Sequence, residues 1–86
     1  MEDLKDIRQK IDNIDAQMAS LLVARLELCG EIAKYKAEHD MPIYDSAREK
    51  EVLANAVSNG GEYAEYAVSM QQVVIGLCKR YQNEQI

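Results

Sequence analysis

Three charged side chains near the middle of the sequence have the spacing of one helical turn. Asp45, Arg48 and Glu49 stand at i, i+3 and i+4, which places an acid, a base and a second acid on one patch of a helix. Ser46 and Glu49 also match the S-x-x-E capping box of a helix N-terminus. We therefore predict that Ser46 caps a helix, with Asp45 as an alternative N-cap, and that Asp45, Arg48 and Glu49 wall a ligand pocket.

An arginine interrupts an otherwise apolar helical stripe in the first half of the chain. The repeat position between Leu21 and Leu28 is occupied by Arg25. A charge in an apolar seam is costly unless it is paired and hydrogen-bonded. One interpretation is a polar residue that fixes register or oligomeric state, with its stem packed and its head in water. The other is a ligand-binding arginine inside a helical bundle.

Two further basic residues, Lys36 and Arg8, lie on the same predicted helix as Arg25, and their distances from it along the helix indicate which of them could share a ligand with it. Lys36 follows Arg25 by eleven residues, or ~16 Å along a helix, so the two long side chains could grip a ligand of roughly 6 to 8 Å. Arg8 precedes Arg25 by seventeen residues, or ~25 Å. It is therefore too far away to share a small ligand with Lys36 of its own chain. An antiparallel partner helix would bring the partner's Arg8 to that ligand.

Cys78 and Gln82 are candidate site residues, but each also has a plausible purely structural role. They stand at i and i+4, so they share one face of a helix. A free cysteine is often a small core residue, and a glutamine near a C-terminus is usually exposed to solvent. Their spacing alone does not decide between these interpretations and a place in a site.

The elements that must position these residues are all helical in pattern. Apolar residues recur at steps of three and four from Leu4 to Tyr35, apart from one step of seven across Arg25, and this periodicity predicts one long helix. It would be ~50 Å long, whereas a compact chain of this size is only ~25 Å across. The long helix must therefore pack against another chain or project.

Breaker residues divide the rest of the chain into two further helices. Pro42 ends the long helix, and a second helix is expected from about Ser46 until Ser58–Glu62 breaks it. A third should run from about Glu62 to Gln82. No strand pattern competes with these periodicities. The predicted fold is all-α, with one long, one short and one medium helix in a homodimeric bundle.

Composition limits the classes of function. A chain of 86 residues predicts a single domain over residues 1–86, and its marginal core favours oligomerisation. The net charge of −5 argues against nucleic acid and anionic membranes as partners. One histidine and two isolated cysteines suggest neither a metal site nor a disulfide framework. With no signal-like N-terminus and no long apolar run, we expect a soluble cytoplasmic protein with free cysteines.

The chain resembles the all-α class of chorismate mutases, which are intertwined three-helix homodimers. The Asp-x-x-Arg-Glu motif of that family is matched at Asp45–Glu49. The run IRQKIDNIDAQMASLLVAR at Ile7–Arg25 and the K-x-K at Lys34–Lys36 match as well. The resemblance is strong from Leu4 to Glu51 and looser from Ser58 to Gln82. It implies the rearrangement of chorismate to prephenate, a pericyclic step toward phenylalanine and tyrosine that needs no cofactor or metal.

The resemblance also implies roles for the residues nearest the breaking bond. Arg25 and the partner's Arg8 would grip the side-chain carboxylate of chorismate. Lys36 would contact the ether oxygen and a carboxylate, and Gln82 would be the other donor to the ether oxygen. These roles fit the physics, because the enzyme must hold a compact conformer and aim preorganised donors at the oxygen that gains charge.

The remaining roles concern the ring of the substrate. Arg48 would neutralise the charge of a substrate carboxylate. Asp45, through its backbone, and Glu49 would contact the ring hydroxyl. Cys78 falls where the family often has a serine near the ring carboxylate, and a thiol is a weaker donor than a hydroxyl. Two alternatives remain at this stage: an isochorismate-pyruvate lyase on the same fold, and a non-catalytic helical dimerisation module.

Overall fold

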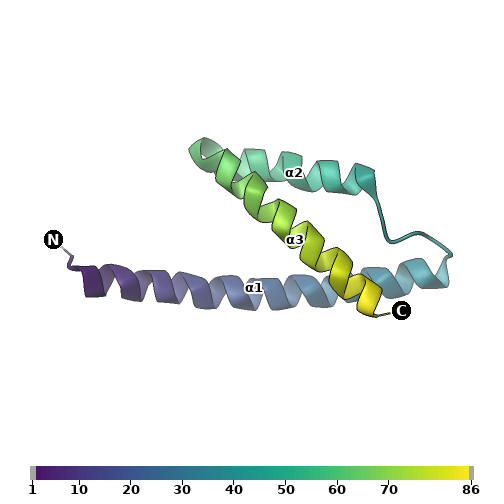
Figure 1. Ribbon diagram of the computed structural model, residues 1–86, viewed down its shortest axis with the longest axis horizontal. Helices are drawn as coiled ribbons and strands as arrows, with labels where there is room; N and C mark the ends of the chain where they lie inside the picture. Colours follow the sequence, from purple (N-terminus) through teal and green to yellow (C-terminus); the bar gives the residue numbers. More distant parts are fainter. Residues whose placement is uncertain (1, 86) are drawn as a thin grey trace.

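The computed structural model of the chain describes residues 2–85, and they form an all-α fold. Helix α1 spans Leu4–Glu38, α2 spans Ser46–Gly60 and α3 spans Ala64–Glu84, with a 3₁₀ turn, η1, at Gly61–Tyr63. Because η1 joins α2 directly to α3, the chain has two helical arms, of which the second bends back on itself (Figure 1). The predicted order of a long, a short and a medium helix is confirmed at 35, 15 and 21 residues.

Helix α1 has well-defined ends. At its start, the Asp3 side chain accepts a hydrogen bond from the Asp6 backbone N–H at 2.9 Å. At its end, Asp40 takes a positive φ of 53°, and the Met41 N–H donates to the Lys36 carbonyl at 2.8 Å. This is the closure of a Schellman motif, with an aspartate in the left-handed position that glycine usually fills. The chain therefore leaves α1 sharply and turns toward α2.

Helix α2 begins with Asp45 as its N-cap. Asp45 Oδ1 accepts from the Arg48 backbone N–H at 3.0 Å, so Ser46 is the first residue inside the helix. The prediction that Ser46 caps the helix was wrong, and the alternative cap is the one observed. A carboxylate at this place also gains from the positive end of the helix dipole. Asp45 thus fixes the N-terminus of α2, which carries Arg48 and Glu49.

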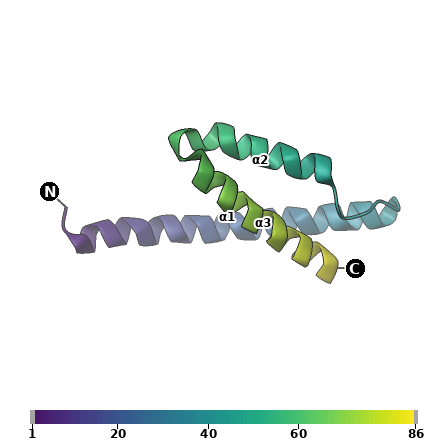
Figure 2. The same ribbon diagram turned by 45° about the horizontal axis from the view of Figure 1, so that its top comes forward.

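The reversal between α2 and α3 depends on two glycines. A Cβ on Gly60 would lie 2.9 Å from the Ala67 Cβ, and Gly61 has a φ of 56°, in a region that favours glycine. The predicted break at Ser58–Glu62 is therefore confirmed, although α2 continues to Gly60. Figures 1 and 2 show α2 and α3 diverging from this reversal, with the end of α3 against α1.

Helix α3 packs against the second half of α1 through small residues. A Cβ on Gly30 would lie 3.1 Å from the Tyr81 ring, and Ala33 is buried at this crossing. Here Cys29 and Cys78 form a disulfide, with their Cα atoms 6.1 Å apart. The expectation of two free cysteines was wrong. The residues are 49 positions apart in sequence, and only the crossing of α1 and α3 brings them together.

The first half of α1 has no helix packed against it within the described chain. Its apolar residues are exposed, and the molecule measures 57 × 24 × 14 Å with a radius of gyration of 16.1 Å. A compact chain of this length would have a radius of about 12 Å. No helix within residues 2–85 is both long and apolar enough to cross a membrane. The exposed stripe consists of Leu4, Ile7, Ile11, Ile14, Met18 and Leu21.

Reduction of the disulfide should destabilise the fold. Opening a cross-link between residues 49 positions apart restores entropy to the unfolded chain and should lower the free energy of unfolding by about 4 kcal/mol. Urea unfolding with and without dithiothreitol measures this difference. The variant with both Cys29→Ser and Cys78→Ser is the control and should not respond to the reductant. Equal midpoints for oxidised and reduced protein would contradict the prediction.

Candidate active site

One cavity of about 270 Å³ lies where the end of α1, the start of α2 and the end of α3 converge. These three segments lie toward the same end of the molecule (Figure 1). The connector between α1 and α2 closes one side through Ile43. Seven of the eight residues that we predicted for the site line this cavity: Arg25, Lys36, Asp45, Arg48, Glu49, Cys78 and Gln82.

Lys36 is held in the cavity wall by the connector. Its Nζ donates a hydrogen bond to the Ile43 carbonyl at 3.0 Å, and its side chain is part-buried. An ammonium has three N–H donors, so two remain for a ligand. The bond orients Lys36 and at the same time fixes the connector against α1.

Gln82 is buried, at 5% exposed, although its place near the C-terminus suggested solvent exposure. Its Nε2 donates to the Cys29 carbonyl of α1 at 3.1 Å. That bond determines which end of the amide faces α1 and leaves a second N–H on the same nitrogen. The side chain is therefore an oriented neutral donor in the cavity wall.

Arg25 lies part-buried in the same wall. Its Nη1 is 3.6 Å from the Cys29 sulfur, and within residues 2–85 no carboxylate forms an ion pair with it. A part-buried guanidinium that lines a cavity without an internal counter-ion is placed to take an anionic ligand. The geometry thus favours the ligand-binding interpretation of Arg25 over a purely structural one.

The two charged residues of α2 have different surroundings. Arg48 lies 4.0 Å from Glu51 in an exposed pair, which contributes little to stability. Glu49 Oε2 lies 3.0 Å from the Nζ of Lys79, a residue that we did not predict for the site. Lys79 follows Cys78 and precedes Gln82 by three positions. The i, i+3 spacing to Gln82 was the signal that could have placed it on the same face.

Cys78 differs from its predicted state. It lines the cavity, but its sulfur is bonded to Cys29. A bridged sulfur has no S–H, so in this state Cys78 cannot donate a hydrogen bond to a substrate carboxylate.

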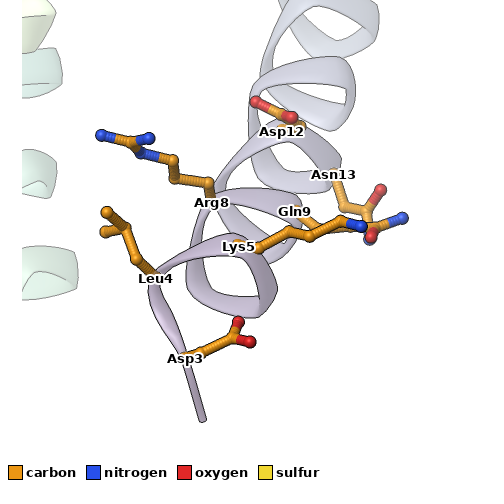
Figure 3. Close-up of a pocket in the computed structure, with 7 residues that line it drawn as sticks. All are labelled: Asp3, Leu4, Lys5, Arg8, Gln9, Asp12 and Asn13. Carbon is orange, nitrogen blue, oxygen red and sulfur yellow. The ribbon is translucent and has the colours of Figure 1, made fainter.

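Arg8 lies outside the cavity. It borders a separate, open hollow of about 660 Å³ whose lining comes only from Asp3 and the first turns of α1. Figure 3 shows its guanidinium extending away from the helix. This agrees with the expectation that Arg8 cannot reach the ligand of its own chain.

The cavity is positive although the chain is acidic. Four cations line it (Arg25, Lys36, Arg48 and Lys79) against two carboxylates (Asp45 and Glu49), while the whole chain has a net charge of −5. No group of three or more histidine, cysteine or acidic side chains in residues 2–85 is arranged to hold a metal ion. The arrangement suits a small dianion that also accepts and donates hydrogen bonds.

Comparison with known families agrees with this chemistry. Residues 7–83 match the family described as chorismate mutase type II. The chain belongs to this family. The predicted resemblance is therefore confirmed over nearly the whole sequence.

Curated relatives carry related names and are longer than this chain. The T-protein of Haemophilus influenzae is 43% identical over 53 residues, which are 62% of this chain and 14% of that protein. The bifunctional chorismate mutase/prephenate dehydratase of Aquifex aeolicus is 32% identical over 84 residues, covering 91% of this chain and 23% of that protein. The chorismate mutase of Methanocaldococcus jannaschii is 40% identical over 50 residues, 58% of this chain and 50% of that protein. No solved structure matched the chain.

Substitution of Gln82 tests its buried position in this chorismate mutase fold. Gln82→Ala should leave a cavity and cost about 2 kcal/mol of unfolding free energy, whereas the closer-sized Gln82→Leu should stay within about 1 kcal/mol of wild type. Urea unfolding at fixed protein concentration measures both. Gln72→Ala, at an exposed position of α3, is the control and should change stability by less than about 0.5 kcal/mol. Equal effects at both glutamines would contradict the buried position.

Proposed function

We propose that this protein is a chorismate mutase that rearranges chorismate to prephenate without a covalent intermediate, cofactor or metal. The observation that carries the proposal is that Arg25, Lys36 and Gln82 line the same cavity. These residues come from different parts of the sequence and supply two cations and a neutral donor. The family membership of residues 7–83 supports the same reaction.

Lys36 and Gln82 stabilise the ether oxygen as its bond to carbon breaks. That oxygen gains negative charge in the transition state, so donors already aimed at it lower the barrier. Lys36 offers the N–H groups that its bond to Ile43 leaves free, and Gln82 offers its second N–H. Because both side chains are held by backbone carbonyls, little reorientation is required during the reaction.

Arg25 and Arg48 bind the two carboxylates of chorismate, and Glu49 accepts from the ring hydroxyl. Asp45 contributes through its backbone, because its side chain caps α2. Cys78 lines the same cavity, and the family resemblance assigns it to the neighbourhood of the ring carboxylate. Binding the substrate at several points selects the folded conformer in which the reacting carbons approach each other.

The active form is an antiparallel homodimer in this proposal. The exposed apolar residues of α1 are nearly self-complementary about the point between Gln17 and Met18, where a two-fold axis would pair Ile14 with the partner's Leu21 and Ile7 with the partner's Leu28. The same axis sets Arg8 of the partner subunit opposite Glu27, two positions from Arg25. The partner would therefore bury the stripe and add a further cation to the cavity.

In this proposal residues 1–86 act as one mutase domain, which binds neither nucleic acid nor a membrane. We also propose a cytoplasmic location, although the Cys29–Cys78 disulfide is unusual there. Cytosolic disulfides, where they occur, are mostly transient, catalytic or redox-sensing.

Loss of Arg25 should abolish most of the activity. Arg25→Ala removes a charge-assisted hydrogen bond to a substrate carboxylate. Its loss should cost ~3 kcal/mol of transition-state binding, or roughly a hundredfold in kcat/KM. The assay follows loss of chorismate absorbance and identifies prephenate by chromatography. Arg80→Ala is the control, since Arg80 is exposed and pairs with Glu84, and it should match wild type. Two results with folded wild-type protein would contradict the proposal. If the protein releases pyruvate and salicylate from isochorismate and leaves chorismate unchanged, it is the lyase. If it converts neither substrate, the dimerisation module is favoured.

Gln82→Glu should make the activity depend on pH. The new carboxyl can donate to the ether oxygen only when it is protonated, and burial raises the pKa of a carboxyl group. Activity should therefore be retained at low pH and lost as pH rises through the pKa of that carboxyl. The wild-type amide does not titrate, so the wild-type profile should lack this fall. Parallel profiles of kcat/KM for the two proteins would exclude Gln82 as an ether-oxygen donor.

A further inference from the structure

Lys79 is a cation in the cavity wall that the roles above leave unused. Its Nζ lies 3.0 Å from Glu49 Oε2 and 4.7 Å from the centroid of the Tyr44 ring. The Lys79 side chain is 38% exposed and that of Glu49 is 27% exposed. One ammonium thus joins α3 to the first turn of α2 and to the connector that precedes Asp45.

We propose that Lys79 is a positioning residue that holds the Glu49 carboxylate for the ring hydroxyl of the substrate; this inference rests on the proposed function. A dianion that enters the cavity is repelled by any carboxylate in its wall. The ion pair offsets the charge of Glu49, while a carboxylate still has lone pairs on both oxygens to accept a hydrogen bond. Lys79 therefore permits an acid to serve as an acceptor in an anion-binding site.

Two features distinguish this pair from an ordinary surface ion pair. Glu49 Oε2 is buried and accepts no hydrogen bond within the described chain, so its pairing with Lys79 is purely electrostatic and is screened by water less than it would be at an open surface. The Tyr44 ring holds the ammonium from another side through a cation–π contact. The lysine thus has a defined place, and its loss should change the charge and the orientation of Glu49 together.

Lys79→Met should raise KM for chorismate about tenfold with kcat within about twofold, because the hydroxyl contact is made in both ground and transition states. Lys79→Arg keeps the charge and should recover most of the affinity. Lys50→Met is the matched control, since Lys50 is exposed on α2 outside the cavity, and it should match wild type. An unchanged KM for Lys79→Met would overturn the proposal.

A double-mutant cycle with Glu49→Gln tests whether Lys79 acts through Glu49. Once the carboxylate is neutral, Lys79→Met should change KM by less than about twofold further. Independent, multiplying effects would show that Lys79 acts without Glu49 and would overturn the positioning role. Calorimetric binding of a bicyclic oxa-diacid, a mimic of the transition state, repeats the cycle without turnover. Wild type that binds the diacid with this coupling but does not convert chorismate would refute the proposed function and not the positioning role.

A second, independent observation is that the disulfide lies inside the cavity wall. Both Cys29 and Cys78 line the cavity. The Cys29 sulfur is 3.6 Å from Arg25 Nη1, and the Cys29 carbonyl accepts from Gln82. The bridge therefore contacts Arg25, and the backbone of one of its cysteines holds Gln82; the proposed function assigns both residues to the substrate.

We infer that the Cys29–Cys78 bridge is a redox switch of this cavity, reduced by a low-molecular-weight thiol. The thiolate of the first reductant molecule attacks the sulfur of Cys78, the less buried of the two residues. The bridge breaks, and Cys29 leaves as a thiolate beside the Arg25 guanidinium. A second thiolate then attacks the reductant sulfur of the mixed disulfide and releases Cys78. In sum, two external thiols become one disulfide and the protein gains two thiols, whose protons come from the reductant.

Reduction should lower KM for chorismate at least threefold, because Cys78 regains an S–H donor in the cavity wall. Assays before and after dithiothreitol measure this change, and thiol titration of the unfolded protein measures the state of the bridge. Cys29→Ser cannot form the bridge and should not respond to the reductant. Equal KM values for protein with zero and with two titratable thiols would overturn the switch. Because the titration needs no turnover, inactive protein in both states would count against the proposed function alone, and calorimetry with the diacid would then decide the switch.

Discussion

The close crossing of α3 over α1 is the interaction on which the site depends. It is possible because Gly30 leaves room for the Tyr81 ring, and because Ala33, which is small, is buried on the same stretch of α1. At this crossing Gln82 bonds to the Cys29 carbonyl, and the disulfide joins the same two helices. A larger side chain at position 30 would displace α3, and with it the donor that we assign to the ether oxygen.

The second constraint is that one chain does not bury its own apolar surface. Few residues are buried within the single chain, while the stripe on the first half of α1 is exposed. The hydrophobic effect therefore favours a partner along α1, and the same partner would supply the arginine that this chain cannot bring to its own cavity. Stability and catalysis are linked in this account, because one interface serves both.

The sequence predicted the helices well because their signals are local. The apolar periodicity of the long helix, Pro42 and the paired glycines at 60 and 61 each act on the chain within a few residues of their own positions. The capping prediction failed at Ser46 because Asp45 is an equally good N-cap one position earlier. The burial of Gln82 and the Cys29–Cys78 bridge could not be derived from local pattern, since both depend on where α3 crosses α1. Lys79 was missed because the role that we assign to it depends on its ion pair with Glu49, a residue that is distant in sequence.

Complementation between two inactive variants tests most directly whether the site is completed across a dimer. Arg8→Ala and Arg25→Ala chains with different tags would be co-expressed, and the mixed dimers purified through both tags. In a mixed dimer, the cavity of the Arg8→Ala chain keeps its own Arg25 and receives the partner's intact Arg8. The account predicts about half of the wild-type activity per mixed dimer, with little in either parent dimer. Mixed dimers as inactive as both parents would contradict a site shared between two chains.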